Sequence, residues 1–133
     1  MTMWLTMALA AQVSVAAAPD RVCVDPRTGY PNVDFALINT ADKPVAITEI
    51  RGLVFGRDGA VIERRLVWQD SLKAIRPDSK LPARGTAVVY NQMPFHNAAP
   101  GRRMRFEFDL DEPGSAPVAV EFTPVDCAAG QPG

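Results

Sequence analysis

The sequence predicts an all-β domain: an antiparallel β-sandwich of about seven strands, similar to immunoglobulin or fibronectin type III domains. Apolar and polar residues alternate along short segments, and clusters of turn residues separate these segments. The chain also contains nine glycines and twelve prolines, which suit turns better than long helices. A closed barrel with a similar number of strands is the competing architecture. The 133 residues suffice for one domain.

Turn clusters delimit the expected strands, which cover residues 21–24, 33–39, 45–55, 60–68, 86–90, 102–110 and 117–123. Alternation is clearest in 102–110, where Met104, Phe106, Phe108 and Leu110 point inward. In 45–55 the alternation slips at Arg51-Gly52, which indicates a β-bulge there. The Gly56–Gly59 segment contains Asp-Gly and predicts a tight hairpin. One or two helical turns are expected over residues 70–75.

The N-terminal segment has the composition of a secretory signal peptide. Fourteen of its first 18 residues are hydrophobic and none is charged. A short apolar stretch followed by small residues is typical of an export signal and too short to span a bilayer comfortably. We expect residues 1–17 to form this signal, with cleavage after Ala16 or Ala17. The region lacks a basic residue at its start, so retention as a weak anchor stays open as an alternative.

The two cysteines lie near opposite ends of the expected domain, residues 18–127. An even number of cysteines in an exported chain favours a disulfide, and we expect Cys23 to bond with Cys127. The spacing differs from CxxC, and a tetrahedral zinc site would need two further ligands, of which the single histidine could be only one. The tail, residues 128–133, is expected to be disordered.

Charge and motifs exclude several classes of function. The net charge is −1, with 14 basic and 15 acidic residues, which gives no electrostatic basis for binding nucleic acid. The sequence contains no GxSxG motif and no glycine-rich phosphate loop, and Asp109, Asp111 and Glu112 have the pattern of a solvated turn. We therefore expect no enzymatic activity, no cofactor and no membrane span in the mature chain.

One histidine and a nearby methionine offer the only metal hypothesis. His96 and Met93 together could bind copper(I), because imidazole and thioether groups suit that ion. The competing explanation places Met93 in the core and leaves His96 solvated or hydrogen-bonded on a loop. We treat copper binding as the alternative function and assign no metal site.

Several arginines and aromatic residues are candidates for contact with a protein partner. Arg64 and Arg65 lie in one strand, and Arg103 and Arg105 lie in another; as neighbours these strands would form a basic patch. The competing explanation is ion pairing across strands with Glu63, Glu107 and Asp109. Further candidates come from the loops expected over 68–84 and 91–101, namely Trp68, Phe95 and His96. A tryptophan in the position of Trp68 more commonly covers the edge of a core.

Three turn-type motifs resemble those of small exported bacterial sandwich domains: residues 35–45 (FALINTADKPV), 54–61 (VFGRDGAV) and 91–96 (NQMPFH). The last resembles an Asn-Pro-Phe-His loop, with two residues inserted, of the non-catalytic domain that precedes lysostaphin-like zinc peptidases. The peptidase half of that family needs several histidines and an aspartate for zinc, which His96 alone cannot supply, so no catalytic residue carries over. The resemblance implies an accessory or binding module.

These observations together predict a secreted or periplasmic module that acts by binding an unknown protein of the bacterial cell envelope. Exposed sheet edges and the loops over 68–84 and 91–101 are the expected contact places.

Overall fold

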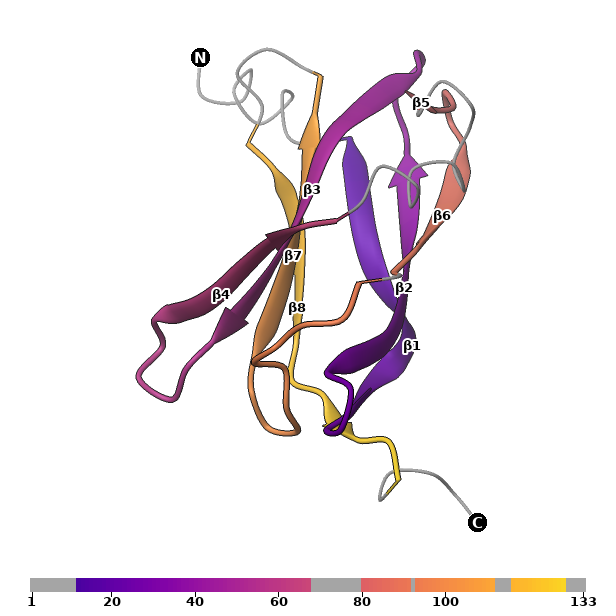
Figure 1. Cartoon of the computed structure of the whole chain (residues 1–133). Helices are drawn as coiled ribbons and strands as arrows, with labels where there is room; N and C mark the ends of the chain where they lie inside the picture. Colours follow the sequence, from indigo (N-terminus) through magenta and orange to yellow (C-terminus); the bar gives the residue numbers. More distant parts are fainter. Residues whose placement is uncertain (1–11, 68–79, 92, 112–115, 129–133) are drawn as a thin grey trace, which may run out of the picture.

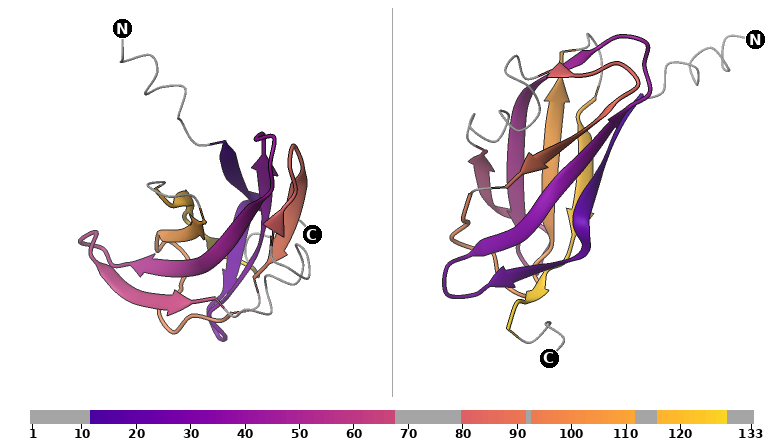
Figure 2. Two further views of the ribbon diagram at one scale, coloured as in Figure 1. Left: turned by 90° about the horizontal axis from the view of Figure 1, so that it is seen from above. Right: turned by 90° about the vertical axis from the view of Figure 1, so that its right-hand side faces the viewer.

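The computed structural model describes residues 12–67, 80–91, 93–111 and 116–128. Two sheets face each other as a sandwich, and the described residues include no helix (Figures 1 and 2). One sheet has the order β6-β2-β1-β9 and the other β4-β3-β7-β8, with β5 paired to β3. The strands are β1 (Val13–Asp25), β2 (Tyr30–Asn39), β3 (Val45–Phe55), β4 (Val61–Leu66), β5 (Lys80–Leu81), β6 (Thr86–Tyr90), β7 (Met104–Leu110), β8 (Val118–Phe122) and β9 (Val125–Asp126).

The predicted sandwich is confirmed, but its strands differ from those predicted. The two-residue strands β5 and β9 were not expected, because pieces this short carry no periodicity. The expected helical turns over 70–75 lie outside the described residues. Within the described ranges, no helix is long and apolar enough to cross a membrane.

Strand β1 begins eight residues earlier than the predicted strand 21–24. Its first half, Val13 to Ala18, pairs antiparallel with β2 from Asn39 back to Asp34. The Val13 side chain is only 4% exposed and belongs to the core, and Val15 and Ala17 pack against that core. These residues therefore alternate as a half-buried strand does, although their composition also fits the end of an export signal. The domain in this structure starts before residue 18.

The disulfide between Cys23 and Cys127 is confirmed. Their Cα atoms lie 4.7 Å apart, across a sequence separation of 104 residues. Cys23 lies in the second half of β1, which also pairs in parallel with β9, and the Cys127 amide donates to the carbonyl of Val24. The bond thus fastens the start of the sandwich to the segment that follows its last strand. Such a bond indicates an oxidising, extracytoplasmic environment.

The core is organised around the ring of Phe106 on β7. Phe35 of β2 lies 4.6 Å from it between ring centroids, Phe122 of β8 lies 5.9 Å away, and Phe95 of the β6–β7 connection lies 5.7 Å away. Phe106 has no exposed surface, as predicted for the inward positions of this strand. Aromatic contacts at these distances stabilise beyond the area they bury, so Phe106 connects both sheets and the loop.

The predicted irregularity in β3 exists, but at other positions than Arg51-Gly52. Its register shifts lie between Ile47 and Glu49, opposite β7, and between Val54 and Phe55, opposite β4. Gly52 is in regular register. A glycine is required there because a Cβ atom would lie 2.4 Å from Cζ of Phe95, whose ring packs directly on the backbone. The glycine at position 52 therefore marks the close approach of the Phe95 ring to the β3 backbone, and not a bulge.

The predicted hairpin at Gly56–Gly59 is confirmed and joins β3 to β4. Gly59 has a φ of +86°, which glycine adopts without steric cost, and the Gly56 amide donates to the Ala60 carbonyl at 2.8 Å. The end of this hairpin projects away from the body of the sandwich (Figure 1). The projection explains why four of the six residues of β4 are exposed: Val61, Ile62, Arg64 and Leu66.

We expect Gly52→Ala to lower the free energy of unfolding by about 1–3 kcal/mol, because the buried Phe95 ring has no room to move. Chemical denaturation measures this loss. The double variant Gly52→Ala/Phe95→Leu should lose less free energy of unfolding than the two single variants lose together, because the smaller side chain at position 95 relieves the clash. Full additivity would contradict the proposed contact.

Removing the disulfide should destabilise the protein strongly. Opening a loop of this length costs about 4–5 kcal/mol in the chain-entropy model. We expect the variant Cys23→Ser/Cys127→Ser, and the wild type in reductant, to melt well below the oxidised wild type. The double variant itself should not respond to reductant. An unchanged melting temperature of the wild type in reductant would contradict a stabilising role for the bond.

Candidate interaction surface

The β6–β7 connection, residues 91–103, crosses from one sheet to the other and is fixed at both ends. Near its start, the Tyr30 hydroxyl donates a short hydrogen bond to the Asn91 carbonyl, and Asn91 Nδ2 donates to the Pro31 carbonyl at 3.3 Å. Further on, the Phe95 amide donates to the Gly29 carbonyl at 2.8 Å. We call residues 93–98 the strap. Its backbone bonds explain how Phe95 reaches the core from a loop.

Glu63 on β4 anchors the other side of the strap. Its carboxylate accepts hydrogen bonds from the amides of His96 (3.0 Å) and Asn97 (2.7 Å), and a third from Asn97 Nδ2 (3.2 Å). The Glu63 side chain is 8% exposed. A carboxylate that accepts several N–H groups satisfies donors that would otherwise be unpaired in the loop. Glu63 therefore has a structural role in holding the strap. The sequence had suggested only that it pairs with an arginine.

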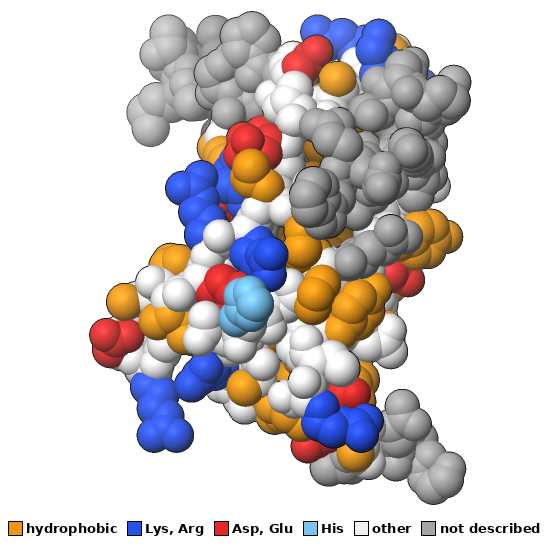
Figure 3. Space-filling model, viewed as in Figure 1, with side chains coloured by type: hydrophobic (Ala, Val, Ile, Leu, Met, Phe, Trp, Pro, Cys, Tyr) orange, Lys and Arg blue, Asp and Glu red, His pale blue; other side chains and the backbone are white. Residues whose placement is uncertain are grey.

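Three predicted contact residues meet at one cavity. Arg65, Phe95 and His96 line a hollow of about 240 Å³ between β4, the strap and the β1–β2 turn. Arg65 Nη1 donates to the Pro94 carbonyl at 3.2 Å and lies 3.9 Å from Glu63. Phe95 faces inward and is 1% exposed, so its ring is a core residue. His96 lies exposed on this face (Figure 3).

The copper hypothesis gains no support from the placement of its two ligands. Met93 is 4% exposed and belongs to the core, as the competing explanation held, whereas His96 is exposed. Among the side chains that the structure describes, no three of the types His, Cys, Asp and Glu come together so as to hold a metal ion.

Arg103 and Arg105 are paired with carboxylates rather than gathered with Arg64 and Arg65 in a free patch. The strands that carry Arg64 and Arg105, β4 and β7, are separated by β3, so they are not neighbours. Arg105 donates to Glu107 at 2.9 Å and to Glu121 at 2.8 Å. Arg103 also pairs with Glu121, and its guanidinium lies 4.0 Å from the centre of the Phe55 ring. Arg105 thus pairs within β7 through Glu107, whereas the cross-strand partner of both arginines is Glu121 on β8, a residue that the competing explanation did not name.

Arg51 is the centre of this charged network, and sequence reasoning did not single it out. Although it is only 7% exposed, it faces the outer side of the sheet, where Asp109 binds it through two hydrogen bonds of 2.6 and 2.8 Å. Glu49 and Glu107 complete its partners at 2.5 and 3.1 Å. The Asp109 hydrogen bonds raise the pKa of Arg51, and Arg51 lowers the pKa of Asp109. Arg64 lies exposed beside this network.

The predicted contact residue Trp68 lies outside the described residues.

Strand β6 offers a different surface. Among the described residues it is an edge strand of the four-stranded sheet. Its five residues, Thr86 to Tyr90, include no charged side chain. β4, an edge strand of the other sheet, carries Glu63, Arg64 and Arg65 at its centre. Charged side chains in an edge strand oppose pairing with another chain, whereas an uncharged edge leaves N–H and C=O groups ready to pair. The edge of β6 is thus the more permissive of the two.

Apolar side chains continue from this edge onto the outer face of the sheet. Val88 and Tyr90 are 41% and 49% exposed, and Ile38 on the neighbouring strand is 44% exposed. Val88 lies opposite Ala36 in the ladder, and Tyr90 lies opposite Asp34. Hydrophobic side chains are visible on the β6 side of the molecule in Figure 3. We call β6 together with Ile38 the β6 surface.

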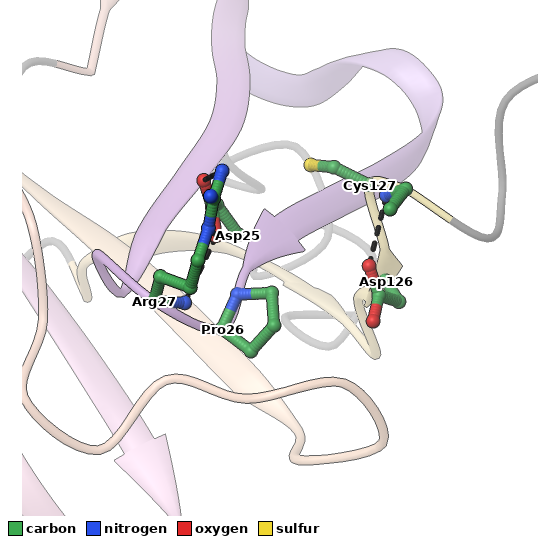
Figure 4. Close-up of a pocket in the computed structure, with 6 residues that line it drawn as sticks. Asp25, Pro26, Arg27, Asp126 and Cys127 are labelled. Atoms are coloured by element: carbon green, nitrogen blue, oxygen red, sulfur yellow. Dashed lines mark hydrogen bonds and ion pairs between the residues drawn. The ribbon is translucent and has the colours of Figure 1, made fainter.

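A larger hollow, of about 580 Å³, lies beside the disulfide (Figure 4). Its charged groups already have partners. Arg27 binds Asp25 at 3.3 Å, and the Asp126 carboxylate accepts from the Ala128 amide at 2.8 Å. The hollow therefore shows no unpaired charge, among its described lining residues, that would select a ligand.

The described residues form a two-sheet β-sandwich whose edge strand β6 carries no charge and pairs, among them, with β2 alone. No protein-family model and no curated protein matches the chain. Among solved structures, it is similar to the crystal structure of a Bordetella pertussis protein that carries the provisional name ApaA. The TM-score is 0.50 with 17% identity, over 86% of this chain and 94% of that one. At this identity the likeness shows the fold alone.

The charged network generates a pH prediction. Because Arg51 lowers the pKa of Asp109 from its ordinary 3.8, the stabilisation is complete above that value and is lost as the pH falls through the lower folded-state pKa. Asp109→Asn should therefore be less stable than the wild type at pH 7, and the difference should shrink on acidification to pH 2. Urea denaturation across this range measures it. Asp111→Asn, at an exposed carboxylate, serves as control; a constant difference for Asp109→Asn would contradict the assignment.

Proposed function

We propose that this protein is a periplasmic or secreted, non-catalytic module that binds a protein of the bacterial cell envelope by strand addition at the β6 surface. In this mode an extended segment of the partner pairs with the free edge of a sheet. Main-chain hydrogen bonds supply affinity, and alternate side chains supply specificity.

The observation that carries the proposal is the uncharged edge of β6, continued by exposed Val88, Tyr90 and Ile38. Soluble domains commonly protect such edges with charges, prolines or bulges. An exposed apolar patch beside an unprotected edge is typical of an interaction site. The sandwich also offers a rigid support, because Val89, between the two exposed residues, is buried in the core.

Two further points support an extracytoplasmic accessory role. The Cys23–Cys127 bond fits an oxidising compartment, and the N-terminal composition fits export. The resemblance of residues 91–96 to the sandwich domain ahead of lysostaphin-like peptidases adds a cell-envelope context. The paired state of Arg103 and Arg105 makes the charged face a weaker candidate for the same role.

Site-specific photocrosslinking in the native cells tests the proposal. A benzophenone amino acid at position 88 should give a discrete adduct with an envelope protein, which mass spectrometry then identifies. The same probe at position 61, an apolar position on edge strand β4 that is at least as exposed as position 88, should not capture that protein. Capture of the same protein from position 61 alone would contradict a site at β6.

A matched pair of variants then tests affinity for the captured partner. Val88→Lys/Tyr90→Lys should weaken binding by about tenfold or more, because it places charges on the edge and removes apolar contacts. Val61→Lys/Leu66→Lys makes the same change on β4 and should leave binding unchanged. Both pairs alter exposed side chains, so melting temperatures should stay close to that of the wild type. Equal loss in both pairs would contradict the proposal.

A further inference from the structure

The first half of β1 pairs with β2 along one side, and its inward side chains pack against the core. Val13 to Ala18 pair with β2, and Val13, Val15 and Ala17 point toward the core, while Ser14, Ala16 and Ala18 are exposed. β1 also lies beside β8 of the other sheet. The slot that this half of β1 fills therefore consists of the β2 backbone, which supplies hydrogen-bonding groups, and an apolar interior, which accepts every second side chain.

The second half of β1 is held separately. Between Ala18 and Cys23 the ladder shifts register, so that residues 19–22 lie opposite a single residue of β2. Pro19, Asp20 and Arg21 are exposed. Beyond this irregularity, Cys23 is bonded to Cys127 and pairs with both β2 and β9. Loss of the first half would thus leave the second half in place.

The same first half contains the expected cleavage positions. Resting on the proposed export, we propose that the slot filled by Val13–Ala18 becomes a strand-binding site in the processed protein. Signal peptidase hydrolyses the peptide bond after Ala16 or Ala17 while the chain is unfolded. Water adds across that bond, leaving a carboxylate on the removed segment and an amine on the mature chain. The sandwich then folds with the β2 edge open along most of residues 34–39.

The occupant is an extended segment of a protein partner that runs antiparallel to β2. The segment that it replaces defines its chemistry, because Val13, Val15 and Ala17 show what the slot accepts: β-branched or small apolar residues at alternate positions. Larger charged residues at these positions would lie in the core. This site is at the opposite side of β2 from β6, so the two sites are separate.

The test begins with the full-length chain, exported in a Gram-negative host, purified from the periplasm and weighed intact. The probe is a fluorescent peptide of sequence QVSVAAA, residues 12–18, and its matched control carries Asp at the two valine positions. We expect a mass that corresponds to cleavage after Ala16 or Ala17, and saturable binding of the probe by anisotropy. The control should bind at least about tenfold more weakly, because two apolar side chains are lost from the interior.

A second variant keeps the strand in place. Ala16→Gln/Ala17→Val removes the small residues that cleavage needs yet preserves the alternation of exposed and inward positions. This chain should retain Val13 and bind no probe. If the processed chain is unfolded alone, the probe should restore its folded circular dichroism spectrum and the control peptide should not.

Three results would overturn the proposal. The exported product could retain Val13, the processed chain could fail to bind the probe peptide, or two processed chains could form a dimer that prevents the probe from binding. The last would assign the slot to a second copy. None of these results changes the outcome of crosslinking from position 88. Failure of the proposed strand-binding site along β2 can therefore be distinguished from failure of the proposed function at the β6 surface.

Discussion

The contact on which this fold most depends is the aromatic cluster centred on Phe106. Its neighbours come from β2, from β8 and from the strap, so one side chain links the two sheets and the connection between them. The requirement for glycine at position 52 follows from it, because Phe95 reaches Phe106 only by lying against the β3 backbone. Glu63 and the backbone bonds of the strap then hold Phe95 in that position.

This arrangement separates the part of the molecule that supplies stability from the part available for binding. The outer face of the second sheet carries paired charges around Arg51. Arg51 and Arg105 bind carboxylates of the sheet itself and are therefore not free to bind a partner. The first sheet has a different character. Its β6 edge carries apolar side chains and no charge, and the other side of β2 is covered by a segment with the composition of a removable leader.

The sequence predicted the sandwich, the hairpin at Gly56–Gly59, the inward face of β7 and the disulfide, because each leaves a local or countable signal. It did not predict the role of Arg51, since a buried arginine on an outer face depends on three carboxylates that only the strand order brings together. Gly52 was noticed but misinterpreted, because a close approach and a bulge give the same residue. The absence of charge in 86–90 was visible, yet only the strand order shows that this segment is an edge.

Native-state hydrogen exchange of the purified protein tests whether a rigid interior around Phe106 presents an accessible sheet edge at β6. We expect the slowest exchange at amides of β7 and β3, which open only with global unfolding. The outward-facing amides of β6 should exchange far faster than those of β7. Protection of every β6 amide to the level of β7 would mean that this edge is covered, and β6 could then not be a binding edge.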